Sequence, residues 1–90
     1  LVGDIEVTDP ETYVKYAAGV PATVAAFGGT YLIRGASGDV FEGSWAPKRL
    51  VVLEFESIDR VKEWYNSPEY ADLKKLRQGA SKGNLIFADG

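Results

Sequence analysis

A short apolar stretch, R-L-V-V-L-E-F at residues 49–55, most constrains how this chain can fold. Hydrophobic side chains occupy both odd and even positions of the stretch, whereas a strand with one solvated face alternates apolar and polar residues. We therefore expect a β-strand that is buried on both faces, with helices on one side. The second face of its sheet is expected to meet another layer of protein.

Three further strands are expected around this one, because short runs of apolar and β-branched residues lie between turn signals. They cover residues 1–7, 30–35 and 84–89, and residues 40–43 form a short continuation or hairpin arm. Ala36 to Asp39 are expected to form a turn, and residues 44–48 a loop.

The first helical pattern begins at Asp9, a good N-cap that is followed by proline. Pro21 interrupts this pattern, and a proline inside a helix removes one N–H and breaks or kinks the backbone. We therefore expect two helical pieces, at about 9–18 and 21–27, ended by a left-handed turn at Gly28-Gly29.

Two shorter helices are expected before the last strand, because Ser57 and Ser67 are both suitable N-caps and Pro68 follows the second. The first should run to Tyr65 and the second to about Arg77. A loop over residues 78–83 would then lead to the last strand.

The resulting order, β-α-β-β-α-β, fits a single domain over residues 1–90. We expect an α+β, ferredoxin-like fold, with an antiparallel sheet and helices on one face. A domain of 90 residues without cysteine is marginally stable alone, so burial against a partner is a common source of further stability. We therefore expect a homodimer in which two sheets pack back to back as a dimeric α/β barrel.

The absence of Cys and His from the sequence narrows its chemistry. Thiol nucleophiles, His-based acid/base pairs, His-ligated haem and nearly all zinc sites are excluded. We expect no metal and no cofactor, since the carboxylates form no compact cluster of the calcium-loop kind.

The charge pattern and the hydropathy argue against two classes of partner. The net charge is −3, and the one basic concentration, Lys74, Lys75 and Arg77, shares its helix with acidic residues, so we expect no nucleic-acid partner. The sequence has no signal peptide or membrane span, which predicts a cytoplasmic protein without a membrane partner. It begins at Leu1 rather than at methionine, which leaves open that residues precede the first strand.

Three segments of the sequence resemble a known family. They are G-G-T-Y-L-I-R-G (28–35), E-G-S-W-A-P-K-R-L-V-V-L-E-F (42–55) and W-Y-N-S-P-E-Y (64–70), and the resemblance extends over essentially the whole chain. They are similar to the family catalogued as domain of unknown function 1330, DUF1330. The resemblance implies the dimeric α/β barrel superfamily, which includes cofactor-free monooxygenases, lactone isomerases, haem-degrading enzymes and haem peroxidase relatives. The haem-using branches rely on histidine, which this chain lacks, and the family has no assigned activity from which catalytic residues could be transferred.

Arg34 and Glu54 are the candidate catalytic residues, because each is a charged residue in the middle of an apolar strand. If their strands are neighbours, the two side chains could face each other in a pocket. Arg34 would then bind an anion, and Glu54 would orient it or act as a general base. The alternative is a structural ion pair, or exposure at the end of a strand.

The candidate ligand-binding residues are aromatic and basic side chains near the expected helices and loops. They are Trp45, Arg49, Trp64, Tyr65, Tyr70 and Arg77. Tyr hydroxyls and an indole N–H beside a cavity suit an aromatic or oxygenated ligand, although core packing would also explain these residues. Trp45 and Arg49 could equally anchor a dimer, and for Arg77 a surface position is favoured.

These observations leave three hypotheses for the function. The first is a cofactor-independent enzyme acting on a small oxygenated or aromatic organic acid, with Arg34 binding the anion and Glu54 or a tyrosine carrying the proton. The second is a non-catalytic dimer that binds a small organic ligand in the same pocket. The third is a purely structural dimerisation module, which predicts a filled interior without a cavity.

Overall fold

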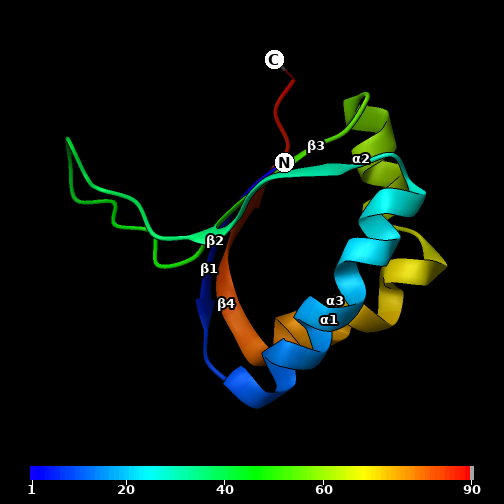
Figure 1. Cartoon of the computed structure of the whole chain (residues 1–90), viewed down its shortest axis with the longest axis horizontal. Helices are drawn as coiled ribbons and strands as arrows, with labels where there is room; N and C mark the ends of the chain where they lie inside the picture. The colour runs from blue at the N-terminus through cyan, green and yellow to red at the C-terminus, as the bar shows by residue number, and fades with distance from the viewer. Residues whose placement is uncertain (90) are drawn as a thin grey trace.

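A computed structural model describes residues 1–89, which form one antiparallel sheet with three helices against one face (Figure 1). The elements in chain order are β1 (Val2–Val7), α1 (Pro10–Ala26), β2 (Thr30–Ala36), β3 (Leu50–Glu54), α2 (Ile58–Tyr65), α3 (Pro68–Ala80) and β4 (Ser81–Ile86). The strands lie in the order β2-β3-β1-β4, and each neighbouring pair is antiparallel. The predicted α+β class is confirmed, and this topology is compatible with a ferredoxin-like fold.

The core lies between the sheet and the helices. Apolar residues of β1 and β3 meet the buried face of α1, and Trp64 and Tyr70 of the two shorter helices close the layer. Its fully or nearly fully buried members are Ile5, Tyr13, Tyr16, Val20, Val24, Leu53, Trp64, Tyr70 and Ala80. In the part of the chain that the structure describes, no helix has the length and hydrophobicity needed to cross a membrane.

The helix α1 continues through Pro21, so the prediction of two separate pieces was wrong. Proline at position 21 deprives the carbonyl of Ala17, four residues earlier, of its usual N–H partner. Arg34 Nη2 donates a hydrogen bond to this carbonyl oxygen at 3.3 Å. The helix therefore tolerates Pro21 because a side chain from β2 supplies the missing donor. Gly28, with φ of 77°, forms the predicted left-handed turn after the helix.

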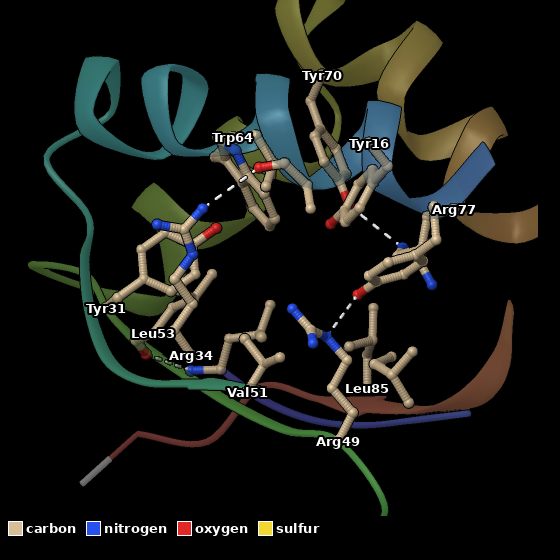
Figure 2. A pocket seen from close by; sticks show the side chains of 15 residues that line it. Tyr16, Tyr31, Arg34, Arg49, Val51, Leu53, Trp64, Tyr70, Arg77 and Leu85 are labelled. Carbon is tan, nitrogen blue, oxygen red and sulfur yellow. Dashed lines mark hydrogen bonds between the residues drawn. The ribbon is translucent and has the colours of Figure 1, made fainter. Parts of the chain in front are cut away.

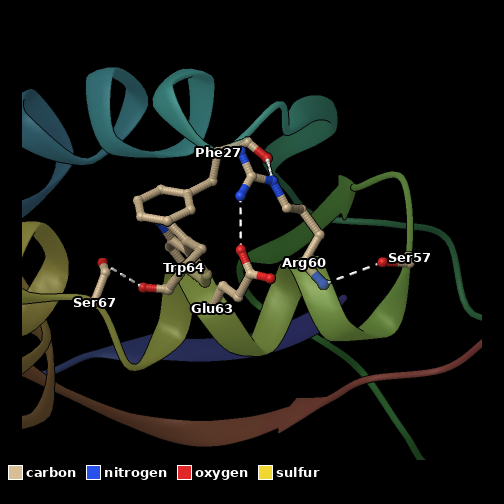
Figure 3. A network of polar contacts seen from close by, with 6 residues as sticks. All are labelled: Phe27, Ser57, Arg60, Glu63, Trp64 and Ser67. Atoms are coloured by element: carbon tan, nitrogen blue, oxygen red, sulfur yellow. Dashed lines mark hydrogen bonds and ion pairs between the residues drawn. The ribbon is translucent and has the colours of Figure 1, made fainter.

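The helices α2 and α3 begin at the serine caps that the sequence predicts, and Figure 3 shows the surroundings of α2. Ser57 accepts a hydrogen bond from the backbone N–H of Arg60 at 3.2 Å, and Ser67 accepts one from that of Tyr70 at 3.3 Å. Ser67 is buried and also donates to the carbonyl of Trp64 at 2.7 Å. This serine therefore joins the end of α2 to the start of α3.

Two predicted segments differ from the structure. Residues 40–43 form no strand: they belong to an irregular connection between β2 and β3 that extends away from the domain in Figure 1. The loop expected at residues 78–83 is also absent, since α3 runs to Ala80 and β4 begins at Ser81 rather than at residue 84. The carbonyl of Ala80 accepts hydrogen bonds from the N–H groups of Thr8 and Asp9, which ties this junction to the start of α1.

The face of the sheet opposite the helices carries an apolar row that crosses all four strands. Val2 on β1 pairs with Ile86 on β4 and with Val52 on β3, and Val52 pairs with Ile33 on β2. Because directly paired residues of antiparallel strands share a face, these four side chains form one line. We call them the open-face row. Ile86 is 58% exposed.

The loop before β3 covers the other end of this open face with polar contacts. Trp45 Nε1 donates to Asp4 Oδ2 at 2.6 Å, and Glu6 forms ion pairs with Lys48 and Lys82 at 3.4 and 3.5 Å. The Lys48 hydrogen bond and the Lys82 charge lower the pKa of Glu6. The open face therefore divides into a polar end, where the loop folds back, and the uncovered apolar row.

Candidate functional site

A cavity of about 40 Å³ lies between the sheet and the helices. Val51, Leu53 and Leu85 form an apolar floor on the sheet, and Trp64 and Tyr70 lie on the helical side (Figure 2). The purely structural hypothesis predicts a filled interior, whereas this interior retains a small cavity.

Three arginine side chains reach the cavity from different elements. Arg34 comes from β2, Arg49 from the residue before β3, and Arg77 from α3 (Figure 2). Among the described residues, no Asp or Glu lines the cavity, and none of the three arginines pairs with a carboxylate. The cavity thus concentrates positive charge beside apolar surface, which suits an anion with an apolar part.

Each guanidinium is held by neutral groups. Arg49 Nε donates to the hydroxyl of Tyr13 at 3.3 Å, and its Cζ lies 5.2 Å from the centre of that ring. Arg34 stacks similarly on Tyr31, at 5.1 Å, while donating to the Ala17 carbonyl. These contacts fix the direction of the guanidinium groups without neutralising their charge.

The third arginine, Arg77, is linked to two buried tyrosines. Its Nε donates to the hydroxyl of Tyr70 at 3.3 Å, and that hydroxyl lies 2.9 Å from the hydroxyl of Tyr16. Burial is the largest single influence on the pKa of Arg77 and lowers it, but the tyrosines around it, first Tyr70 and then Tyr16 and Tyr65, together raise it more, so the net shift is upward and the guanidinium stays charged. Burial raises the pKa of Tyr16 well above its usual value, with a smaller contribution from Tyr70. Tyr16 is therefore a neutral hydrogen-bond donor at physiological pH.

A glycine in β2 makes room for Arg49. Gly35 has φ of 79°, a conformation that glycine adopts readily, and β2 is irregular between Arg34 and Ala36. A Cβ atom at this position would lie 2.5 Å from Cζ of Arg49. The sequence T-Y-L-I-R-G thus places one arginine in the cavity and, through its glycine, leaves space for another.

The structure does not bring Arg34 and Glu54 together, although their strands are neighbours. Arg34 pairs with Val51, whereas Glu54 pairs with Thr30. Glu54 follows the buried Leu53 and so points to the opposite face of the sheet, where it is exposed. Arg34 lines the cavity and Glu54 does not. A general base at Glu54 that acts within this cavity is therefore not supported by the geometry.

Of the six candidate ligand-binding residues, four line the cavity: Arg49, Trp64, Tyr70 and Arg77. Arg77 is half-buried rather than on the surface as favoured from the sequence, because its guanidinium turns to Tyr70. Trp45 lies in the exposed loop on the far side of the sheet, bonded to Asp4.

Tyr65 lies outside the cavity as well. Its ring packs beside Phe87, at 5.7 Å between centroids, and under the Lys74 ammonium, which lies 4.3 Å from the ring centre. Of the two adjacent aromatic residues, Trp64 therefore enters the core, where its Nε1 donates to Thr23 Oγ1 at 3.0 Å, and Tyr65 packs at the border.

Three tyrosines of the cavity were not among the predicted site residues: Tyr13, Tyr16 and Tyr31. Tyr13 and Tyr16 lie on the buried face of α1. The available signal was their hydroxyl groups, because a tyrosine on a buried helix face needs a polar partner. Two such tyrosines one turn apart indicate polar groups inside the core.

The sequence matches the profile of a protein family described as "Domain of unknown function (DUF1330)" over residues 1–90. The chain belongs to the DUF1330 family. A search of curated proteins finds no significant match. The DUF1330 assignment confirms the family resemblance of the sequence, and it brings no activity with it.

One solved structure illustrates how the DUF1330 chain relates to known folds. It is a crystal structure of a protein of unknown function from Rhodopseudomonas palustris, with a TM-score of 0.77 and 18% sequence identity. The alignment covers 94% of this chain and 75% of the other. At this level of identity the similarity concerns the fold alone.

Proposed function

We propose that this protein binds a small organic acid in the cavity between its sheet and helices. The observation that carries the proposal is the set of three arginines, Arg34, Arg49 and Arg77, around a cavity without a lining carboxylate among the described residues. Arg49 and Arg77 are half-buried and Arg34 is exposed, and half-buried charge of one sign is costly unless an opposite charge approaches it. An acid whose apolar part rests on the Val51 and Leu53 floor would supply that charge.

Binding is favoured over proton abstraction by the same geometry. An enzyme that removes a proton from its substrate needs a base within hydrogen-bond reach. The predicted base, Glu54, lies on the other face of the sheet, and the raised pKa of Tyr16 keeps this hydroxyl protonated. A tyrosine here would act as a hydrogen-bond donor, which serves binding directly.

The proposal includes a homodimer formed through the open-face row, as in a dimeric α/β barrel. The helices leave this row of Val2, Ile33, Val52 and Ile86 uncovered within one chain. A second copy would present the same row, and two such sheets can pack face to face. The cavity lies on the helical side, so each subunit would carry its own site.

The proposal is tested by heteronuclear NMR titration of the protein with short and aromatic carboxylic acids and with the corresponding neutral amides. We expect saturable shifts for at least one acid, in residues around the cavity, and none for its amide. Arg49→Gln and Arg77→Gln should each weaken binding about tenfold or more, since a charged hydrogen bond contributes about 1.5–3 kcal/mol.

The matched control is Arg60→Gln, which removes the same charge outside the cavity. Arg60 donates to the carbonyl of Phe27 at 3.0 Å and pairs with Glu63 at 2.6 Å (Figure 3). This variant should retain the affinity of the wild-type protein. Equal losses in all three variants, or no saturable shift with any acid, would refute the proposal.

A further inference from the structure

The hydroxyl groups of the cavity carry more protons than they have acceptors. Tyr16 and Tyr70 share one hydrogen bond, and each hydroxyl carries one proton. Tyr70 also accepts from Arg77, which uses an acceptor position but no tyrosine proton. Whichever hydroxyl donates to the other, one O–H proton of the pair has no acceptor among the described residues.

Tyr13 also carries a hydroxyl proton without an acceptor, beside Arg49. Its hydroxyl accepts from Arg49 Nε, and its own proton meets no acceptor among the described residues. Tyr13, Tyr16 and Tyr70 are 7%, 8% and 0% exposed, so bulk water has little access to these side chains. Buried donors of this kind are normally satisfied by a ligand or by ordered water.

The cavity therefore offers donors of two kinds: charged guanidinium groups and neutral O–H groups. A simple carboxylate would satisfy the first kind. A second oxygen beside the carboxylate, one that only accepts hydrogen bonds, would satisfy the second. A keto oxygen fits this requirement better than a hydroxyl group, because a hydroxyl adds a further proton to a site that already lacks acceptors.

The size of the cavity favours the shortest acids. Its volume of about 40 Å³ is well below the roughly 150 Å³ of a cavity that holds benzene. Benzene and pyruvate each have six non-hydrogen atoms, so even a three-carbon acid must displace lining side chains or extend beyond the enclosed volume, and an acid that also carries a ring must do so to a larger extent. The floor of Val51, Leu53 and Leu85 leaves room for a methyl or short alkyl group.

From these observations we infer that the ligand is a short 2-oxo acid of about three or four carbons. Its carboxylate binds the arginines, its keto oxygen accepts the free proton of the Tyr16–Tyr70 pair, and its alkyl group rests on the apolar floor. The inference rests on the proposed acid binding and specifies the class of acid.

The test compares acids of equal chain length by isothermal titration calorimetry. Pyruvate and propanoate differ by one keto oxygen, lactate replaces that oxygen with a hydroxyl, and phenylpyruvate adds a ring. We expect pyruvate to bind about tenfold more tightly than propanoate, the factor that one hydrogen bond to a buried donor provides. Lactate and phenylpyruvate should bind more weakly than pyruvate.

The double variant Tyr16→Phe/Tyr70→Phe identifies the donor. A single substitution frees the proton of the remaining hydroxyl, so both hydroxyls are removed. The preference for pyruvate over propanoate should fall to about twofold or less, while propanoate binding persists through the arginines. The control Tyr65→Phe removes a hydroxyl outside the cavity and should keep the preference. The wild-type comparison of the acids needs no variant and tests the inference even if the double variant fails to fold.

The outcomes separate the inference from the proposal on which it rests. Equal binding of pyruvate and propanoate, or tighter binding of phenylpyruvate, would overturn the 2-oxo acid while acid binding stands. A preference that survives in the double variant would also overturn it. If none of the acids binds, the acid-binding proposal itself fails.

Discussion

Arg34 illustrates how one side chain can serve both the fold and the site. Its guanidinium lines the cavity, stacks on Tyr31 and donates to the carbonyl that Pro21 leaves without a helical partner. Arg34 is recognisable from the sequence as a charged residue in an apolar strand. Its hydrogen bond to the Ala17 carbonyl is not predictable in this way, because the fold brings together two residues that are 17 positions apart.

At the same scale, Tyr16 should make the protein sensitive to alkali. Its pKa is raised above the usual 10.0 by burial, so the folded state keeps the proton while the unfolded state releases it. Stability is therefore fully present below about pH 10 and falls as the pH rises further. We expect the midpoint of urea unfolding to decrease between about pH 9.5 and 11. Tyr16→Phe should flatten this decrease, and an equally steep decrease in that variant would show that other groups cause it.

At the scale of elements, the sequence predicts most strands and caps correctly, since Ser57, Ser67 and Gly28 act through contacts with their immediate neighbours. Two of the errors lie where a distant residue decides the local structure. The helix continues through Pro21 because of Arg34, and α3 reaches Ala80 because the start of α1 binds its last carbonyl. The hydrophobic periodicity of the sequence predicts neither of these two contacts.

The link between Pro21 and Arg34 can be measured by a double-mutant cycle. Arg34→Ala should destabilise the wild-type protein by about 0.5–1.5 kcal/mol, because it removes the donor to the Ala17 carbonyl. In a Pro21→Ala background the helix supplies its own N–H to this carbonyl, so the same substitution should cost less, and the remaining cost is the lost stacking on Tyr31, which is common to both backgrounds. Urea unfolding of the four proteins gives the coupling. Equal costs in both backgrounds would mean that the two residues act independently.

At the scale of the whole molecule, the candidate site was predictable in part. The sequence pointed to basic and aromatic residues, and Arg34, Arg49, Trp64, Tyr70 and Arg77 all line the cavity. It could not show which face of the sheet Glu54 occupies, because residues 49–55 are apolar at both odd and even positions. It also could not show that Arg34 pairs with Val51, because irregular pairing between β2 and β3 sets the register. A shift by one residue moves a side chain to the other face.

The proposed dimer gives a prediction at this scale. Wild-type protein should sediment as a dimer in analytical ultracentrifugation, and Ile86→Glu should sediment as a monomer with unchanged circular dichroism. Ile86 is 58% exposed in the single chain, so a charge there should destabilise the dimer interface rather than the fold of the subunit. Val14→Glu, at a 66% exposed position of α1, is the matched control and should remain dimeric. A dimeric Ile86→Glu variant would place the interface elsewhere.

The irregular edge strand β2 has a consequence for how copies of this chain can associate. Its pairing with β3 shifts register twice, between Tyr31 and Ile33 and between Arg34 and Ala36. Such bulges twist an outer strand and disturb its row of free N–H and C=O groups, which is a common protection against strand addition by other molecules. Association through a sheet face ends with two copies, whereas association through edges can continue without limit. The bulges of β2, one of which accommodates Arg49, thereby also disfavour fibrous aggregation.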